Sequence, residues 1–228
     1  MNGLIHSSLY FGMLVSVGAY MLGVWLKKKT GWAILNPLLV AIIVVIAFLS
    51  VFHIEYKEYN RGAVYLGYFL TPATVCLAIP LYKQLELLRQ HLIAVASAIV
   101  AGVAGSVGSI YVMCRFFQLE HTHYVTLLPK SITTAIGMGV SEEAGGIVTL
   151  TVISIIITGI LGNIIADWLF QIFKIEEPIA KGLALGTAAH AIGTAKALEL
   201  GEIEGAMSSL SIAVAGLLTV VVVPLMSG

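Results

Sequence analysis

The residues best suited to chemistry in this sequence lie in a stretch of small side chains at positions 184–196 (ALGTAAHAIGTAK). His190 lies deep inside a hydrophobic segment, and an imidazole exchanges protons close to neutral pH. Hydroxyls and freed backbone amides around it could bind a carboxylate. The alternative is a structural histidine bonded to a neighbouring carbonyl. The predicted ligand-binding residues of this stretch are Gly186, Thr187, His190, Gly193, Thr194 and Lys196, with His190 also predicted to couple a proton.

A second candidate is the proline-interrupted stretch at 70–82 (LTPATVCLAIPLY). Each proline removes a backbone donor and clashes with the preceding turn, which leaves carbonyls unpaired inside a hydrophobic segment. Such groups are tolerated in lipid only where protein or a watery cavity covers them. The alternative is a proline kink whose hydroxyls bond their own helix. The predicted ligand-binding residues here are Thr71, Pro72, Ala73 and Thr74.

A third candidate is the hydroxyl-rich start of residues 128–146, from which we predict Ser131, Thr133 and Thr134 as binding residues. The segment either enters the membrane and returns, or forms an interfacial helix with a solvated acidic end. Asp167 is expected in a structural ion pair or as a carboxylate reaching the interface. No Ser/His/Asp set, metal-ligand spacing or phosphate loop is visible, so we expect neither an enzyme nor a bound metal or cofactor.

The elements that must position these residues are helices in a membrane. Of 228 residues, 59% are hydrophobic and only 11% charged, and the mean hydropathy is +0.99. A soluble domain usually carries about a quarter charged residues. The net charge of zero excludes a nucleic-acid partner, and the continuous apolar runs favour helices over barrel strands. The predicted hydrophobic segments are 5–26 (a retained span), 34–52, 62–82, 91–114, 147–172, 178–200 and 203–226.

Three of these segments recur at an offset of about 113 residues, so we predict one transmembrane domain, 1–228, with repeats at about 1–117 and 118–228. Matching interrupted segments in two halves point to a transporter with a site at the membrane midplane. The alternative is duplication without a shared site.

The distribution of Lys and Arg predicts how the repeats are oriented. If residues 128–146 cross the membrane, there are eight spans and the basic residues divide five inside against six outside. If that segment returns, there are seven spans, the repeats are inverted, and the division is seven inside against four outside. Basic residues favour the cytoplasmic side, so we expect inverted repeats with the N-terminus outside and the C-terminus cytoplasmic.

Three stretches resemble the LrgB/CidB family, whose members are described as antiholin-like proteins or murein hydrolase exporters. They are TPATVCLAIPLY at 71–82, LPKSITT at 128–134 with Ser141-Glu142, and GLALGTAAHAIGTAKALE at 182–199. The resemblance covers nearly the whole chain. It implies relatives among plastid glycolate/glycerate translocators and bacterial proteins linked to pyruvate uptake and to autolysis. It also implies inverted repeats with two crossing broken helices and a small LrgA/CidA-type membrane partner.

We therefore expect an all-α protein of the cell membrane with about 7–8 transmembrane segments plus a re-entrant segment. The expected function is secondary transport of a small monocarboxylate such as glycolate, glycerate or pyruvate, coupled to H⁺ or Na⁺, in a homodimer. The alternative is a holin/antiholin-like membrane protein that modulates murein hydrolase activity and autolysis. A pore former needs oligomerising faces but no matched pair of broken helices.

Overall fold

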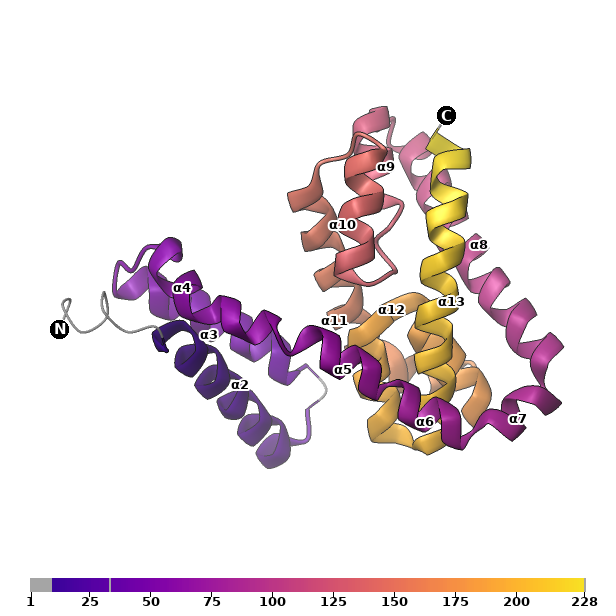
Figure 1. Ribbon diagram of the computed structural model, residues 1–228, viewed down its shortest axis with the longest axis horizontal. Coiled ribbons are helices and arrows are strands. Elements are labelled where there is room, and N and C mark those ends of the chain that lie inside the picture. Colours follow the sequence, from indigo (N-terminus) through magenta and orange to yellow (C-terminus); the bar gives the residue numbers. More distant parts are fainter. Residues whose placement is uncertain (1–9, 33, 228) are drawn as a thin grey trace. The chain divides into compact units, whose positions relative to one another are not determined.

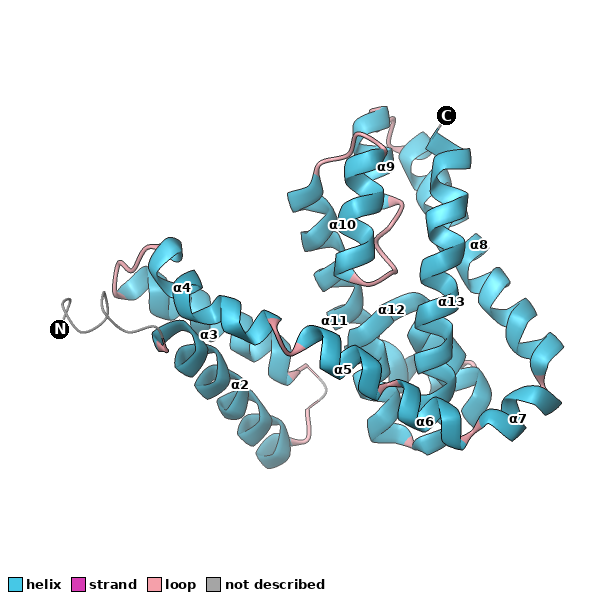
Figure 2. Ribbon diagram, viewed as in Figure 1, coloured by secondary structure: helices cyan, strands magenta, loops and turns pink. Residues whose placement is uncertain are grey.

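The computed structural model describes residues 10–32 and 34–227, apart from the side chains of Leu70, Thr74 and Ser227. These described residues form helices and no strands, as Figure 2 shows, so the predicted all-α class is confirmed. The chain packs as two compact units, Met1–Cys76 and Leu77–Gly228. This boundary differs from the one near 117 predicted for the repeats, and the repeats stay a prediction.

The first unit contains α2 (Phe11–Thr30), α3 (Pro37–Val51), α4 (Tyr56–Gly67) and α5 (Leu70–Cys76). Helix α2 packs against both α3 and α4. Its glycines allow this close approach, because a Cβ at Gly12 would overlap the backbone of Tyr59 and one at Gly23 would lie 2.7 Å from the carbonyl oxygen of Pro37. Helix α2 corresponds to the predicted span 5–26, of which residues 5–9 lie outside the described part.

The predicted interruption of 62–82 is confirmed, and its position follows from the prolines. The segment consists of the end of α4, the short α5 and then α6 (Ala78–Lys83). Pro72 and Pro80 each stand third in their helix, within the first turn, where a missing amide breaks no intrahelical bond. The helix breaks therefore come just before the prolines, and the carbonyls that the prolines leave without a helical partner stay a prediction.

The second unit begins with α6 and continues through α7 (Leu85–Gln90), α8 (Leu92–Phe116), α9 (His121–Leu127), α10 (Thr134–Glu143), α11 (Val148–Ile172), α12 (Pro178–Leu200) and α13 (Glu202–Ser227). Its core is a stripe on α8 at helical spacing, Val95, Ile99, Val103 and Val107, packed with residues of α9 and α13. The longest helices of this unit are α8, α11 and α13, and Figure 1 shows α8 and α13 along most of their length.

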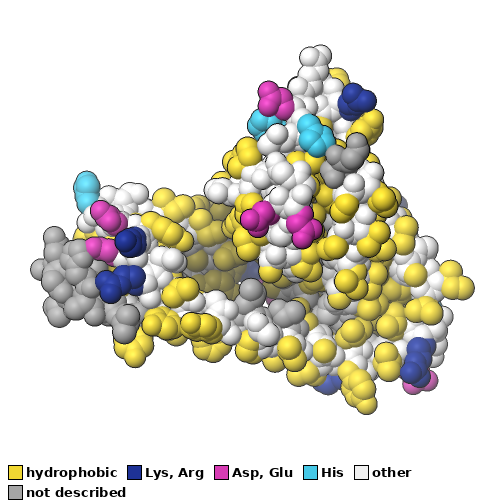
Figure 3. Space-filling model, turned by 45° about the horizontal axis from the view of Figure 1, so that its top comes forward, with side chains coloured by type: hydrophobic (Ala, Val, Ile, Leu, Met, Phe, Trp, Pro, Cys, Tyr) yellow, Lys and Arg dark blue, Asp and Glu magenta, His cyan; other side chains and the backbone are white. Residues whose placement is uncertain are grey.

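The chain is a multi-pass membrane protein. Four helical stretches are long and apolar enough to cross a bilayer: Tyr56–Lys83, Leu92–Phe116, Val148–Ile172 and Glu202–Met226. Large apolar side chains on them remain exposed, including Ile93, Trp168 and Leu217. The face in Figure 3 is mostly hydrophobic, with charged side chains in small separate groups. The larger number of spans predicted above stays a prediction.

Residues 121–146 form a hairpin, called the first hairpin below. The amide of Ile147 donates to Oγ1 of Thr126 (2.8 Å), and Oγ1 of Thr151 donates to the carbonyl of Thr126 (2.9 Å). The chain between 127 and 146 has therefore returned to the point from which it left. Its tip is the loop between α9 and α10. This contact favours re-entry over crossing. The predicted inverted arrangement depended on re-entry.

Helix α12 also reverses direction, and residues 178–200 form the second hairpin. Ala189 (φ −124°, ψ 15°) and His190 (φ 41°, ψ −134°) leave the helical conformation. A Cβ at Gly193 would lie 2.8 Å from that of Ala189 and overlap the carbonyl oxygen of Leu185, although residues eight apart in a continuous helix are separated by about 12 Å. The predicted interruption is confirmed, but the segment turns back and is not a single interrupted span.

Contacts with α13 confirm the reversal. At the start of α13, Glu204 lies against Gly182 in the first half of α12, and its neighbour Gly205 lies against Leu198 in the second half. Further along α13, Ser208 contacts Gly186, and its hydroxyl shares a hydrogen bond of 2.7 Å with the hydroxyl of Thr194. Both ends of the second hairpin thus lie beside the start of α13, and the tip lies deeper along it.

Candidate functional site

The tips of the two hairpins approach the same part of α11 from opposite ends of that helix. The base of the first hairpin lies beside the start of α11, and the second hairpin begins just after α11 ends. A Cβ at Gly137 of the first hairpin would lie 2.5 Å from the side chain of Ile155. At the tip of the second hairpin, Nε2 of His190 lies 2.9 Å from the carbonyl oxygen of Ile155. In the second unit, two breaks in regular structure therefore lie beside the middle of α11.

The sequence of α11 makes room for the second tip. The His190 ring packs on Gly159, where a Cβ would lie 2.8 Å from Nε2, and Ala189 packs on Gly162 in the same way at 2.6 Å. Nδ2 of Asn163 donates to the carbonyl of Ile192, just beyond the break (3.2 Å). These contacts satisfy one of the carbonyls that the break frees, as a buried helix end requires.

An open cleft of about 700 Å³ runs along this meeting point. One wall is the small-residue face of α8, including Gly102 and Ser106; the opposite wall comes from α11 and from the first half of α12. The tip of the first hairpin contributes Lys130 and Ser131. Most of the lining is alanine, glycine and aliphatic side chains, so its few polar groups decide what it can bind.

Three of those polar groups, Lys130, Ser131 and Ser106, are linked to one another. Nζ of Lys130 donates to Oγ of Ser131 (2.9 Å) and, over 3.5 Å, to Oγ of Ser106. Oγ of Ser106 in turn donates to Oγ of Ser131 (2.9 Å), and Ser131 is buried. Among the residues that the structure describes, hydroxyls alone therefore hold this lysine ammonium at the tip of the first hairpin.

The other residues predicted in the second hairpin form contacts within the protein, and their binding roles stay a prediction. Thr187 donates to the carbonyl of Leu183 (2.7 Å) and Thr194 to that of His190 (3.1 Å), so both hydroxyl protons are used within α12. Of these two threonines, Thr187 lines the cleft and Thr194 does not. Gly186 allows close packing against α13, and Gly193 allows close packing between the two halves of the hairpin.

Lys196 forms an ion pair, and its ligand-binding role stays a prediction. Its Nζ lies 2.7 Å from Oδ2 of Asp167, across α11 and α12. The pair agrees with the structural role expected for Asp167 and supplies the counter-charge for Lys196.

The predicted hydroxyls outside α12 are distributed unequally. Ser131 lies in the cleft, whereas Thr133 and Thr134 begin α10 and are not among the residues that line it. Thr71, Pro72 and Ala73 are exposed on α5 in the first unit. The side chain of Thr74 lies outside the described residues.

Sequence reasoning missed three hydroxyls of the cleft, Ser106, Ser109 and Thr158. Ser106 lies in the glycine-rich run of α8 (Gly102, Gly105 and Gly108), and such a run is typical of close helix packing in membranes. Gly102 does pack on Thr187, but a Cβ at Gly105 would meet no atom within 4 Å. The sequence feature that could have indicated these cleft residues is that the same run of small residues also contains hydroxyls.

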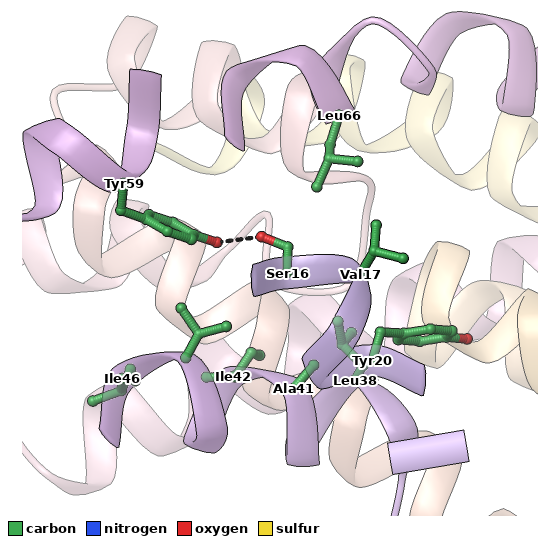
Figure 4. Close-up of a pocket in the computed structure, with 10 residues that line it drawn as sticks. Ser16, Val17, Tyr20, Leu38, Ala41, Ile42, Ile46, Tyr59 and Leu66 are labelled. Atoms are coloured by element: carbon green, nitrogen blue, oxygen red, sulfur yellow. Dashed lines mark hydrogen bonds between the residues drawn. The ribbon is translucent and has the colours of Figure 1, made fainter. Parts of the chain in front are cut away.

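The first unit has a separate cavity of about 510 Å³ among α2, α3 and α4 (Figure 4). Its lining is almost entirely apolar. The polar contact that Figure 4 marks is a 2.7 Å hydrogen bond between Oγ of Ser16 and the hydroxyl of Tyr59. Because each group partners the other, this cavity offers little to a charged ligand.

The architecture can now be compared with known proteins. The model of the LrgB-like family matches residues 16–228. The chain belongs to the LrgB-like family. Three relatives, each called "Antiholin-like protein LrgB", come from Bacillus mycoides (strain KBAB4), Bacillus subtilis (strain 168) and Bacillus cereus (strain B4264). They are 41%, 39% and 40% identical to it over 94–95% of this chain and 94% of theirs. No solved structure matches the chain.

The match confirms the predicted LrgB/CidB resemblance. The names of the LrgB relatives agree better with the antiholin-like alternative than with the transporter that the sequence led us to expect first.

Proposed function

We propose that this LrgB-like protein is an antiholin-like membrane protein that restrains autolysis. The observation that carries this proposal is the similarity to proteins named antiholin-like at about 40% identity over nearly the full length. The multi-pass helical structure is compatible with such a role, which needs no catalytic residue.

The test is the rate of detergent-induced autolysis in cells from which the gene has been deleted. We expect faster lysis and more active murein hydrolase outside the cells, with both restored by expression of the wild-type chain. An unchanged lysis rate in the deletion strain would contradict the proposal.

A second candidate function is transport of a small monocarboxylate. It is favoured by one observation: the tips of two hairpins lie beside the same part of α11, next to a cleft that contains a lysine ammonium and hydroxyls. Broken or re-entrant helices near a midplane site are typical of secondary transporters. In this role His190 would carry or sense the coupled proton, and a homodimer would provide the scaffold.

Transport is tested in proteoliposomes that contain only this chain. We expect saturable uptake of labelled pyruvate or glycolate, and a changed pH dependence of uptake in His190→Ala. Dye leakage without saturable uptake would leave the antiholin-like proposal alone. Uptake that appears only after a small LrgA/CidA-type membrane protein is added would show that the transporter has two components.

A further inference from the structure

The cleft contains hydrogen-bond donors that the described protein does not use. An ammonium has three N–H donors, and two of those on Lys130 go to Ser106 and Ser131. Ser131 accepts from both of these neighbours, so its own hydroxyl proton remains available. Thr158 lines the cleft from α11, and within the described part of the chain its hydroxyl forms no hydrogen bond.

This availability sets Thr158 apart from other hydroxyls near the cleft. Ser109 donates to the carbonyl of Ser106 (2.8 Å), and Thr187 donates within its own helix. Such back-bonding is the usual way a hydroxyl is satisfied inside an apolar helix. Because Thr158 lines the cleft and does not back-bond, its hydroxyl donor is available to a ligand.

The charge of Lys130 is also uncompensated. Within the described residues no carboxylate forms an ion pair with it, in contrast to Lys196 and Asp167. A cation removed from water is costly unless an anion or several acceptors replace the lost hydration. Two serine oxygens replace only part of that hydration, and an anionic ligand would complete it.

We propose that the cleft binds a small organic anion with one carboxylate, held by Lys130, Ser131 and Thr158. This inference rests on the transport candidate and names the binding residues, of which the sequence had indicated only Ser131. A carboxylate offers about four acceptor positions to the available donors. The apolar part of the ligand would lie against the alanines of α12 and the aliphatic side chains of α11.

The test is equilibrium binding of pyruvate to the purified full-length chain in phosphatidylcholine nanodiscs, measured by calorimetry. Pyruvamide, which has the same shape without the charge, is the ligand control. We expect saturable binding of pyruvate and none of the amide. Lys130→Met should weaken binding by about tenfold or more, because it removes a charge-assisted hydrogen bond.

Two further variants keep the test decisive. Thr158→Val preserves side-chain shape in an apolar environment and should weaken binding by about three- to tenfold. Lys174→Met makes the same charge change at an exposed position after α11 and should leave affinity unchanged. If Lys130→Met does not yield a monodisperse protein, Thr158→Val alone decides.

The possible outcomes separate a wrong assignment of binding residues from a wrong function. Binding to wild type that neither variant weakens overturns the assignment of these residues and leaves the transport candidate in place. No binding to wild type, together with no uptake, overturns both. If phosphatidylglycerol in the nanodisc abolishes pyruvate binding, the site takes a lipid headgroup and the proposal of a free organic anion is wrong.

Discussion

At the scale of single residues, His190 has a structural role that the sequence only partly indicated. Its Nε2 contacts the carbonyl of Ile155, and its backbone has a φ of 41°, in the region that favours glycine. The side chain therefore anchors a strained turn. This matches the structural histidine that we kept as the alternative, and a proton-coupling role stays a prediction.

The strain at His190 predicts an unusual order of stabilities. His190→Ala loses the imidazole contact and keeps the strain, whereas His190→Gly loses the contact but relieves strain of about 1–3 kcal/mol. We expect the apparent melting temperature of His190→Gly in detergent to exceed that of His190→Ala. An alanine variant as stable as the glycine variant would contradict a positive φ at this position.

Glycine packing predicts a second effect. A Cβ at Gly186 would overlap Ser211 and lie 2.5 Å from the carbonyl oxygen of Ser208, so Gly186→Ala should destabilise the protein by about 1–3 kcal/mol. Gly108 in α8 is the matched control, because a Cβ there meets nothing within 4 Å. Thermal unfolding of both variants should show a loss for the first and none for the second.

At the scale of elements, hydrophobicity and periodicity were enough to predict where the long helices lie. The segments expected at 91–114 and 147–172 are α8 (Leu92–Phe116) and α11 (Val148–Ile172). The small residues around position 190 also indicated a break. Reversal at that break could not be predicted, because neither Ala189 nor His190 is a glycine or proline that would mark a turn.

The cleft was harder to predict than the helices. Lys130 and Ser106 are 24 positions apart, and only the packing of the first hairpin on α8 brings them together. Hydroxyls in the sequence likewise give no sign of which will bond their own helix. Thr187 and Thr194 were therefore predicted as ligands, and Thr158 was not.

The reversal of α12 can be tested by a distance. In a straight helix, positions 180 and 200 would be about 30 Å apart. In the hairpin, both lie near the start of α13, so spin labels at Ala180→Cys and Leu200→Cys should be separated by about half that distance or less. The labels require a background without Cys76 and Cys114, and double electron–electron resonance gives the distance. A peak near 30 Å would contradict the hairpin.

At the scale of the whole molecule, the second hairpin changes the expected topology. If 178–200 returns to the side it entered, one of the seven predicted crossings is lost, and α13 ends on the side opposite to its start. The helices of unit two run between two sides of the membrane. The side where α8 starts and α11 ends has four basic residues, whereas the opposite side has Arg115. The four are Lys83, Arg89, Lys174 and Lys181.

Basic residues favour the cytoplasmic side, so this arrangement predicts an extracellular C-terminus, opposite to our expectation from sequence alone. Alkaline phosphatase fused after Gly228 should be active and green fluorescent protein at the same position dark. The reverse result would indicate that residues 178–200 cross the membrane. Fusions after Lys83, predicted to be cytoplasmic, provide the internal control.

The two hairpins also constrain how the protein is made. Each half of the second hairpin has about ten residues and is about 15 Å long, roughly half the thickness of the hydrocarbon layer. Neither half can enter the bilayer as an independent span during synthesis, because its polar tip would face lipid without a partner. Because the hairpin packs against both α11 and α13, we expect it to reach its final position only after α13 has been synthesised. We therefore expect unit two to complete its folding inside the membrane, by docking this hairpin.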